Sequence, residues 1–331
     1  MSLTKPIINA SDLFREIRQG NRSGLAKAIT LVESTKESDR QIAEELLKKL
    51  LPFTGTSIRI AVTGVPGAGK STFIESFGDL LTKHDKKVAV LAIDPSSQLT
   101  KGSILGDKTR MEQLSRNPNV FIRPSPTSQA LGGVSFHTRE TILLCEAAGF
   151  NIILIETVGV GQSETNVKSM VDFFLLLLLA GAGDELQGIK KGIMEMADGV
   201  VINKADGENI KPSQQAKADV QNALHLQLSS PSGWSAKVLT ISALENTGIE
   251  EVWKMIHEYQ EFTTSNGFFS ENRRLQKKEW LEESIESYFR LIKNEPSLTE
   301  KKEALIKDVM SDQILPGEAA RKYWEKLKER N

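Results

Sequence analysis

The chain has 331 residues, and its 42 lysines and arginines against 43 aspartates and glutamates leave a formal net charge of −1. No overall field therefore favours nucleic acid or an anionic membrane. The single cysteine, Cys145, excludes an intramolecular disulfide, and its apolar helical setting at 141–148 indicates a buried structural thiol. Charged residues interrupt the N-terminus, and the longest apolar run, 173–180, is far shorter than the roughly 20 residues that cross a bilayer. The sequence predicts a soluble, cytoplasmic protein.

Residues 1–55 are predicted to form an N-terminal helical segment. Apolar residues follow a helical period in two stretches, one at 13–31 and one at 42–51, and Pro52 closes the second stretch.

From residue 56 the pattern changes to short apolar runs that alternate with amphipathic helical stretches. This alternation is typical of an α/β fold with a doubly wound, mostly parallel sheet, which binds ligands at the carboxyl ends of its strands. We predict one such domain over 56–262. Its expected strands are 58–63, 88–93, 120–122, 152–155, 173–179, 200–202 and 238–241, and the strand at 173–179 is expected to be buried on both faces.

After residue 248 the strand pattern stops, and residues 263–331 are predicted to form a C-terminal helical arm. Expected helices are 249–262, 274–293, 301–311 and 318–329, with prolines 296 and 316 as breaks between them. The helix at 274–293 carries an apolar stripe. Such a stripe either packs against the chain's own sheet domain or forms a dimer interface, and the pattern leaves both open. The stripe consists of Trp280, Ile285, Phe289 and Ile292.

The most informative motif lies at 64–71, where GVPGAGKS matches the phosphate-binding loop G-x-x-x-x-G-K-[ST] at every fixed position. It stands between the strand 58–63 and a helical run, which is the setting this loop requires. The glycines let backbone N–H groups turn toward a phosphate, Lys70 can neutralise its charge and Ser71 can ligate Mg²⁺. The residues expected to contact the nucleotide phosphates are Gly64, Val65, Pro66, Gly67, Ala68, Gly69, Lys70, Ser71 and Thr72.

A second motif identifies the base. Asn203, Lys204 and Asp206 follow the strand 200–202 and fit the N-K-x-D guanine signature. The Asp206 carboxylate can accept hydrogen bonds from guanine N1–H and the 2-amino group, and against adenine it would stay unpaired at a cost of about 1–3 kcal/mol or more. The stem of Lys204 can lie along the base. After the last strand, GTPases place a loop that contacts the base edge, here Ser242, Ala243 and Leu244.

Acidic residues near strand ends are candidates to bind Mg²⁺ and to position water, because Mg²⁺ takes oxygen ligands. Asp94, Asp107 and Glu156 are the candidates, with a solvated loop carboxylate as the plain alternative for each. Glu156 occupies the place of the D-x-x-G aspartate, whose glycine, here Gly159, offers its N–H to the γ-phosphate. Gln162 is displaced relative to the D-x-x-G-Q pattern, so the water-orienting residue is not assigned.

Six blocks of the sequence belong together: AITLVE at 28–33, the loop at 64–71, DPSS at 94–97, GSILGDKTRM at 102–111, ETVGVGQSE at 156–164 and NKAD at 203–206. In combination they resemble the MeaB/ArgK GTPases, the group that includes the human methylmalonic aciduria type A protein. The resemblance implies a P-loop GTPase that acts as a chaperone for an adenosylcobalamin-dependent acyl-CoA mutase, usually methylmalonyl-CoA mutase. It would gate cofactor loading and help to replace damaged cofactor, and a cobalamin adenosyltransferase is a further candidate partner.

The same resemblance implies a homodimer joined through the C-terminal arm and a mobile switch at 183–192. A lysine at the position of Lys190 is associated with mutase-stimulated hydrolysis in this family. A mobile cation near the γ-phosphate could stabilise the transition state as an arginine finger does, which is worth about 10³–10⁵ in rate. A solvated loop lysine is the alternative.

Two other functions are alternatives to a mutase chaperone. A metal-insertion GTPase of the nickel or hydrogenase-maturation kind needs Cys/His clusters, and one cysteine with four separated histidines does not provide them. A binding module that uses GTP only for stability would share the same motifs without their catalytic use.

Overall fold

The computed structural model describes residues 9–94, 111–126, 135–157, 163–180, 191–225 and 230–328. A seven-stranded sheet has the order β3-β2-β4-β1-β5-β6-β7, and every neighbouring pair is parallel. All the predicted strands are present, and the doubly wound α/β fold is confirmed. The strands are β1 (Ile58–Gly64), β2 (Val88–Asp94), β3 (Val120–Pro126), β4 (Ile152–Thr157), β5 (Phe173–Leu179), β6 (Gly199–Asn203) and β7 (Lys237–Thr240).

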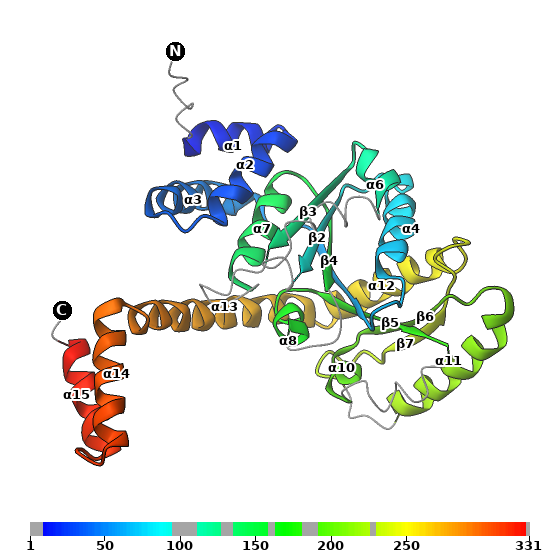
Figure 1. Ribbon diagram of the computed structural model, residues 1–331. Helices are drawn as coiled ribbons and strands as arrows, with labels where there is room; N and C mark the ends of the chain where they lie inside the picture. The colour runs from blue at the N-terminus through cyan, green and yellow to red at the C-terminus, as the bar shows by residue number, and fades with distance from the viewer. Residues whose placement is uncertain are drawn as a thin grey trace.

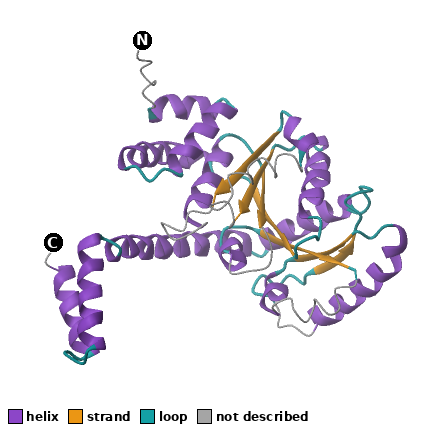
Figure 2. Ribbon diagram, viewed as in Figure 1, coloured by secondary structure: helices purple, strands orange, loops and turns teal. Residues whose placement is uncertain are grey.

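Helices flank the sheet on both sides (Figures 1 and 2). Helix α4 packs against α6 and α12 on one face, and α7 lies on the other, as expected for right-handed crossovers between parallel strands. The helices of this domain are α4 (Lys70–Lys83), α6 (Glu112–Arg116), α7 (Ser135–Ala147), α8 (Ser163–Lys168), α10 (Lys191–Met196), η3 (Gly207–Asn209), α11 (Ile210–His225) and α12 (Ile249–Ser265).

The N-terminal segment contains α1 (Ala10–Arg18), α2 (Arg22–Val32), α3 (Glu37–Leu50) and η1 (Leu51–Phe53). The prediction of a single helical stretch at 13–31 is wrong, because the chain turns at Gly20, with φ of 73°, between α1 and α2. Asn21 then starts the second helix, since its side chain accepts hydrogen bonds from the Ser23 and Gly24 N–H groups at 2.9 and 3.1 Å. The helical period of the apolar residues did not show that the first helix ends at Gly20 and that Asn21 starts a second one.

The core runs through the whole sheet and into the N-terminal helices. Strand β5 is buried from Phe173 to Leu178, as its unbroken apolar sequence predicted. Leu13, Ile17 and Leu25 of α1 and α2 belong to the same hydrophobic cluster as the strands. Cys145 is fully buried, and burial raises the pKa of its thiol, so the predicted structural role is confirmed. Among the described helices, none combines the length and apolar composition needed to span a bilayer.

The C-terminal region consists of α13 (Phe268–Lys293), α14 (Pro296–Met310) and α15 (Pro316–Lys328). The arm helices start earlier than predicted, and the prolines explain part of the difference. Pro296 and Pro316 do separate helices, but each also stands at the first position of the following helix, where a missing N–H costs nothing. In Figure 1, α13 leaves the sheet domain and carries the α14–α15 hairpin away from it.

The predicted apolar stripe on α13 is only partly confirmed. Ile285, Phe289 and Ile292 are 46%, 50% and 36% exposed, so a large part of their apolar surface is left uncovered by the chain itself. Trp280 is only half-exposed, and at five residues from Ile285 it is turned about 140° around the helix. Trp280 therefore does not belong to the stripe, and its inclusion was wrong.

Candidate functional site

Two glycines shape the loop between β1 and α4. Gly64 has a φ of 150°, and a Cβ built there would lie 2.2 Å from the Leu177 carbonyl oxygen. Gly69 has a φ of 84°, and its Cβ would lie 2.6 Å from the side-chain nitrogen of Asn203. A larger residue at either position would push a neighbouring element away. The loop therefore leads tightly into the N-terminus of α4, whose free N–H groups favour an anion.

Lys70 lies over this loop. Its Nζ donates to the carbonyl oxygens of Gly64 and Val65 at 2.9 and 3.2 Å, and its side chain is buried. Burial lowers the pKa of the ammonium group, and the charge of Glu156 opposes that shift. A cation held in this way is placed at the positive end of α4, where a phosphate would receive both the charge and the helix N–H groups.

Two of the predicted magnesium ligands are in contact. The Ser71 hydroxyl donates to Oε1 of Glu156 at 2.9 Å, because Ser71 lies in the first turn of α4 and Glu156 lies near the end of β4, the strand beside β1. A hydroxyl and a carboxylate form a hard oxygen donor set that fits Mg²⁺. Beside Glu156, Thr157 donates to the Thr63 hydroxyl at 2.8 Å and joins the ends of the two strands.

The other predicted catalytic and metal residues are only partly placed. The backbone of Asp94 ends β2, which pairs with β4, so Asp94 is at the same edge of the sheet as Glu156. Asp107, Gly159 and Lys190 lie outside the described residues.

The predicted base-recognition residues meet the phosphate loop directly. The Asn203 side chain donates through Nδ2 to the Ala68 carbonyl at 2.8 Å and accepts at Oδ1 from the Ala243 N–H at 3.1 Å. Lys204, next to it, adopts a left-handed backbone with φ of 60°, which turns the chain sharply after β6. Asn203 therefore joins the phosphate loop to both loops that sequence reasoning assigned to the guanine base.

The carboxylate of Asp206 is oriented by a serine. Ser242 donates through Oγ to Oδ2 of Asp206 at 2.5 Å and accepts from the Glu245 N–H at 3.1 Å. With its hydroxyl fixed from two sides, Ser242 holds Asp206 ready to accept from a donor such as guanine N1–H. Leu244 is 78% exposed, so its side chain is open to solvent.

Sequence reasoning missed one contact of this site. Ser76, in the second turn of α4, donates its hydroxyl to the Ala243 carbonyl at 2.6 Å. A single serine inside a helix has no motif that announces a partner more than 160 residues away in the chain. The phosphate and guanine signatures predicted the loops of the site, but they did not predict the hydrogen bond between α4 and the loop that contains Ala243.

Comparisons with known proteins agree with this geometry. A family model described as "Methylmalonyl Co-A mutase-associated GTPase MeaB" matches residues 25–295. GTPase ArgK of Escherichia coli is 50% identical over 276 residues, which cover 83% of each chain. The methylmalonic aciduria type A homolog of Mus musculus is 46% identical over 319 residues, which cover 93% of this chain and 77% of the relative.

A solved structure extends the similarity to nearly the whole chain. The crystal structure of a LAO/AO transport system kinase has 38% sequence identity and a TM-score of 0.77, and the match covers 99% of this chain and 100% of that one. The predicted resemblance is thus confirmed. With a family model over most of its length and these relatives, the chain belongs to the MeaB family of methylmalonyl-CoA mutase-associated GTPases.

Proposed function

We propose that this protein binds GTP and Mg²⁺ in the cytoplasm and hydrolyses GTP as a chaperone for an adenosylcobalamin-dependent acyl-CoA mutase. Methylmalonyl-CoA mutase is the first candidate partner, and a cobalamin adenosyltransferase is a second. The observation that carries GTP binding is the Asn203 side chain, which bonds to the phosphate loop and to the base-edge loop at once. Family membership supports the link to a mutase.

The residues of the site supply the parts of phosphoryl transfer. Lys70 would neutralise charge on the β- and γ-phosphates, while Ser71 and Glu156 would hold Mg²⁺, with Asp94 and Asp107 as further candidates. The bound Mg²⁺ would offset charge that develops on the phosphate oxygens. Mg²⁺ usually keeps several water ligands and takes one or two from protein, so the Ser71–Glu156 pair is a sufficient anchor.

A nickel-type maturation GTPase gains no support from the site. Among the described residues, no three His, Cys, Asp or Glu side chains gather in a group that could hold a metal ion. The candidate donors around the phosphate loop are oxygens, which suit Mg²⁺ rather than a soft or borderline metal.

Stimulation by the mutase is proposed to act through Lys190. The mutase would place the Lys190 cation near the γ-phosphate, where Gly159 would offer its N–H group. The gain in rate could then reach the 10³–10⁵ range of arginine fingers.

Turnover of GTP and ATP, with and without methylmalonyl-CoA mutase, tests this function. We expect slow hydrolysis of GTP alone, faster hydrolysis with the mutase and little turnover of ATP. Lys190→Ala should lose the stimulation and keep the intrinsic rate, whereas Lys191→Ala, its neighbour, is the matched control. Equal turnover of GTP and ATP would rule out the proposed guanine preference.

A binding module that uses GTP only for stability is tested separately. Lys70→Ala removes the cation of the phosphate loop and should abolish nucleotide binding. If the variant still protects the mutase from inactivation as well as the wild type does, GTP is not part of the chaperone cycle.

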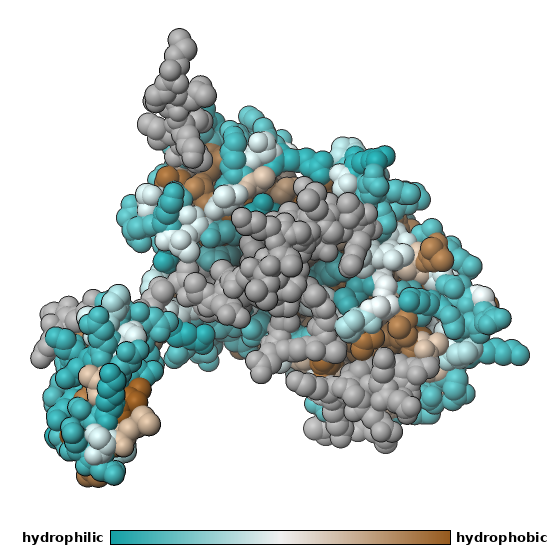
Figure 3. All heavy atoms as spheres, in the orientation of Figure 1, coloured by the Kyte–Doolittle hydropathy of each residue, from teal (hydrophilic) through white to brown (hydrophobic). Residues whose placement is uncertain are grey.

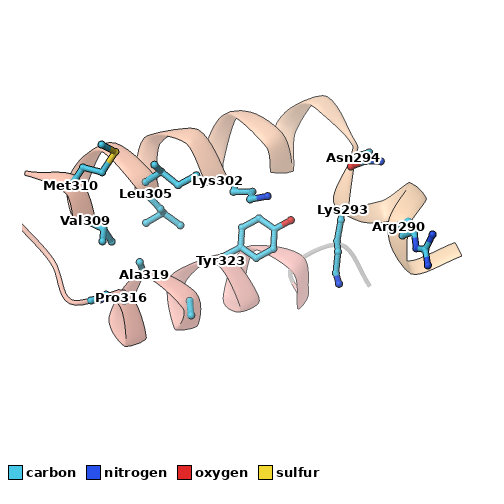
Figure 4. A pocket seen from close by; sticks show the side chains of 12 residues that line it. Arg290, Lys293, Asn294, Lys302, Leu305, Val309, Met310, Pro316, Ala319 and Tyr323 are labelled. Atoms are coloured by element: carbon cyan, nitrogen blue, oxygen red, sulfur yellow. The ribbon is translucent and has the colours of Figure 1, made fainter. Parts of the chain in front are cut away.

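We also propose that two copies pair through the C-terminal arm. Besides the exposed stripe of α13, the hairpin of α14 and α15 presents apolar surface (Figure 3). Ile306, Met310 and Leu315 of this hairpin are 46%, 82% and 75% exposed. Between the two helices lies a cavity of about 550 Å³, into which Leu305 and Tyr323 point (Figure 4). Unpartnered apolar surface of this kind marks a protein contact.

A further inference from the structure

The peptide units around Ala243 are held from two sides by different parts of the site. The Ala243 N–H donates to Oδ1 of Asn203 at 3.1 Å, and its carbonyl accepts from the Ser76 hydroxyl at 2.6 Å. Ala243 is buried, the bond to Asn203 is buried, and the bond to Ser76 is partly buried. Asn203 belongs to the guanine signature, but Ser76 belongs to none of the motifs in the sequence.

Ser76 connects the base-edge loop to the helix that carries the phosphate contacts. Helix α4 begins with Lys70 and Ser71, and Ser76 follows in its second turn, about 9 Å along the helix from Lys70 at 1.5 Å per residue. The base-edge loop is therefore tied to the same rigid helix that begins at the phosphates.

The base-edge loop is closed by its own backbone hydrogen bonds. Ser242 and Thr247 exchange two backbone hydrogen bonds of 3.0 Å, which close the loop on itself. Ser242 also donates a hydrogen bond of 2.5 Å to the Asp206 carboxylate. A displacement of the Ala243 carbonyl would thus be passed on to the group that reads the guanine base.

We propose that Ser76 is a positioning residue for guanine specificity. It fixes the Ala243 peptide, and through it the Ser242–Asp206 pair, at the distance from the phosphate loop that a guanine nucleotide requires. Ser76 has this role only if the chain binds guanine nucleotides as proposed above. Contacts that already hold the loop in its binding conformation raise the affinity for the nucleotide, because binding then does not have to order the loop.

The bond of Ser76 is unusual for a helical serine, which commonly donates to a carbonyl of its own helix four residues earlier. Here the hydroxyl donates to a different element. The packing of α4 against α12 does not depend on it, because Phe77 meets Trp253 with ring centroids 6.3 Å apart. Loss of the hydroxyl should therefore leave the fold intact and move the loop alone.

The experiment compares the dissociation constants of GDP and ADP for the wild type and for Ser76→Ala, by isothermal titration calorimetry. ADP reports the phosphate contacts without the guanine contacts. We expect the Kd of GDP to rise about three- to tenfold, the range of one hydrogen bond, and that of ADP to stay within about twofold. Ser76→Thr keeps the hydroxyl and should bind GDP like the wild type.

Thr82→Ala is the matched control, since Thr82 lies on the same helix and its hydroxyl donates to the Asp79 carbonyl and accepts from the Asn117 side chain, neither of which belongs to the base-edge loop. It should change neither affinity. If Ser76→Ala lowers the melting temperature, Ser76→Cys, which keeps the size but is a weak donor, is measured in its place.

An unchanged Kd for GDP, or an equal rise for GDP and ADP, would overturn the positioning role of Ser76. A wild type that binds GDP and ADP equally would instead refute guanine recognition itself, and Ser76 with it. The two failures are therefore distinguished by the wild-type measurement alone.

Discussion

At the scale of single residues, the hydrogen bond from Ser242 orients the Asp206 carboxylate so that it can accept hydrogen bonds from a nucleotide base. Asp206 follows β6, and Ser242 follows the neighbouring strand β7, so the parallel sheet delivers both to one edge. The Ser242 hydroxyl bonds to one carboxylate oxygen of Asp206 and leaves the group free to accept further donors. A donor pair such as N1–H and the 2-amino group of guanine matches it, and adenine does not.

Asp206→Asn is expected to exchange the preferred base. The amide of asparagine presents a donor where guanine also presents its 2-amino donor, whereas xanthine presents a carbonyl there. The Kd of GDP should rise at least tenfold, and that of xanthosine diphosphate (XDP) should fall by a similar factor, since a buried unpaired polar group costs about 1–3 kcal/mol. Both constants can be measured by displacement of a fluorescent guanine nucleotide. An unaltered Kd for GDP would mean that Asp206 does not contact the base.

At the scale of elements, several polar contacts hold the first turns of α13 on the sheet domain, and Arg273 makes the most of them. Arg273 donates to both oxygens of the Asp172 carboxylate, at 2.8 and 2.7 Å, and to the Ser57 carbonyl at 2.6 Å. Asp172 stands just before β5 and is only 2% exposed. The Arg59 N–H donates to it as well, at 2.8 Å. A buried carboxylate in this position depends on its cation.

Arg273→Ala should lower the free energy of unfolding by about 3–5 kcal/mol, because it leaves the buried Asp172 charge without its partner. Urea denaturation followed by circular dichroism measures the change. Arg274→Ala is the control, since the Arg274 side chain is 78% exposed and pairs with Glu271 at the surface, where such pairs contribute about 0–1 kcal/mol. Equal effects of the two substitutions would show that the Asp172 contact does not hold α13.

The strands were predictable because each is a short apolar run, and their parallel arrangement follows from the alternation of these runs with helices. The meeting of 64–71 with 203–206 was predictable as well, since parallel strands bring their carboxyl ends to one edge. The bonds of Ser76 and Arg273 were not, because each joins residues far apart in the chain and has no local pattern. The sequence predicts a helix from residue 301, with Pro296 as a break before it, whereas α14 begins at Pro296 itself.

At the scale of the whole molecule, the arm stands away from the rest of the chain (Figure 1). Near the start of α13, Arg273 and Gln276 bond to the sheet domain, while the later turns expose Leu281, Ile285 and Phe289. A chain that buried these side chains internally would have to fold the arm back. A second copy could cover them without any change in the chain, which favours the dimer.

Ile285→Glu combined with Phe289→Glu should therefore convert a dimer into a monomer. The two side chains are 46% and 50% exposed, so charges are tolerated in the free chain, but in a dimer each would be buried without a partner. Size-exclusion chromatography with light scattering measures the mass, for which one chain is 36.6 kDa. Glu286→Lys, turned about 100° from Ile285, is the control and should leave the dimer intact.

If the double variant keeps the mass of two chains, the contact lies elsewhere on the arm. If the wild type already has the mass of one chain, the dimer is refuted. Because Arg273 and Gln276 hold the start of α13 on the sheet domain and the stripe does not, GTP hydrolysis by the monomeric variant should stay at the intrinsic rate of the wild type.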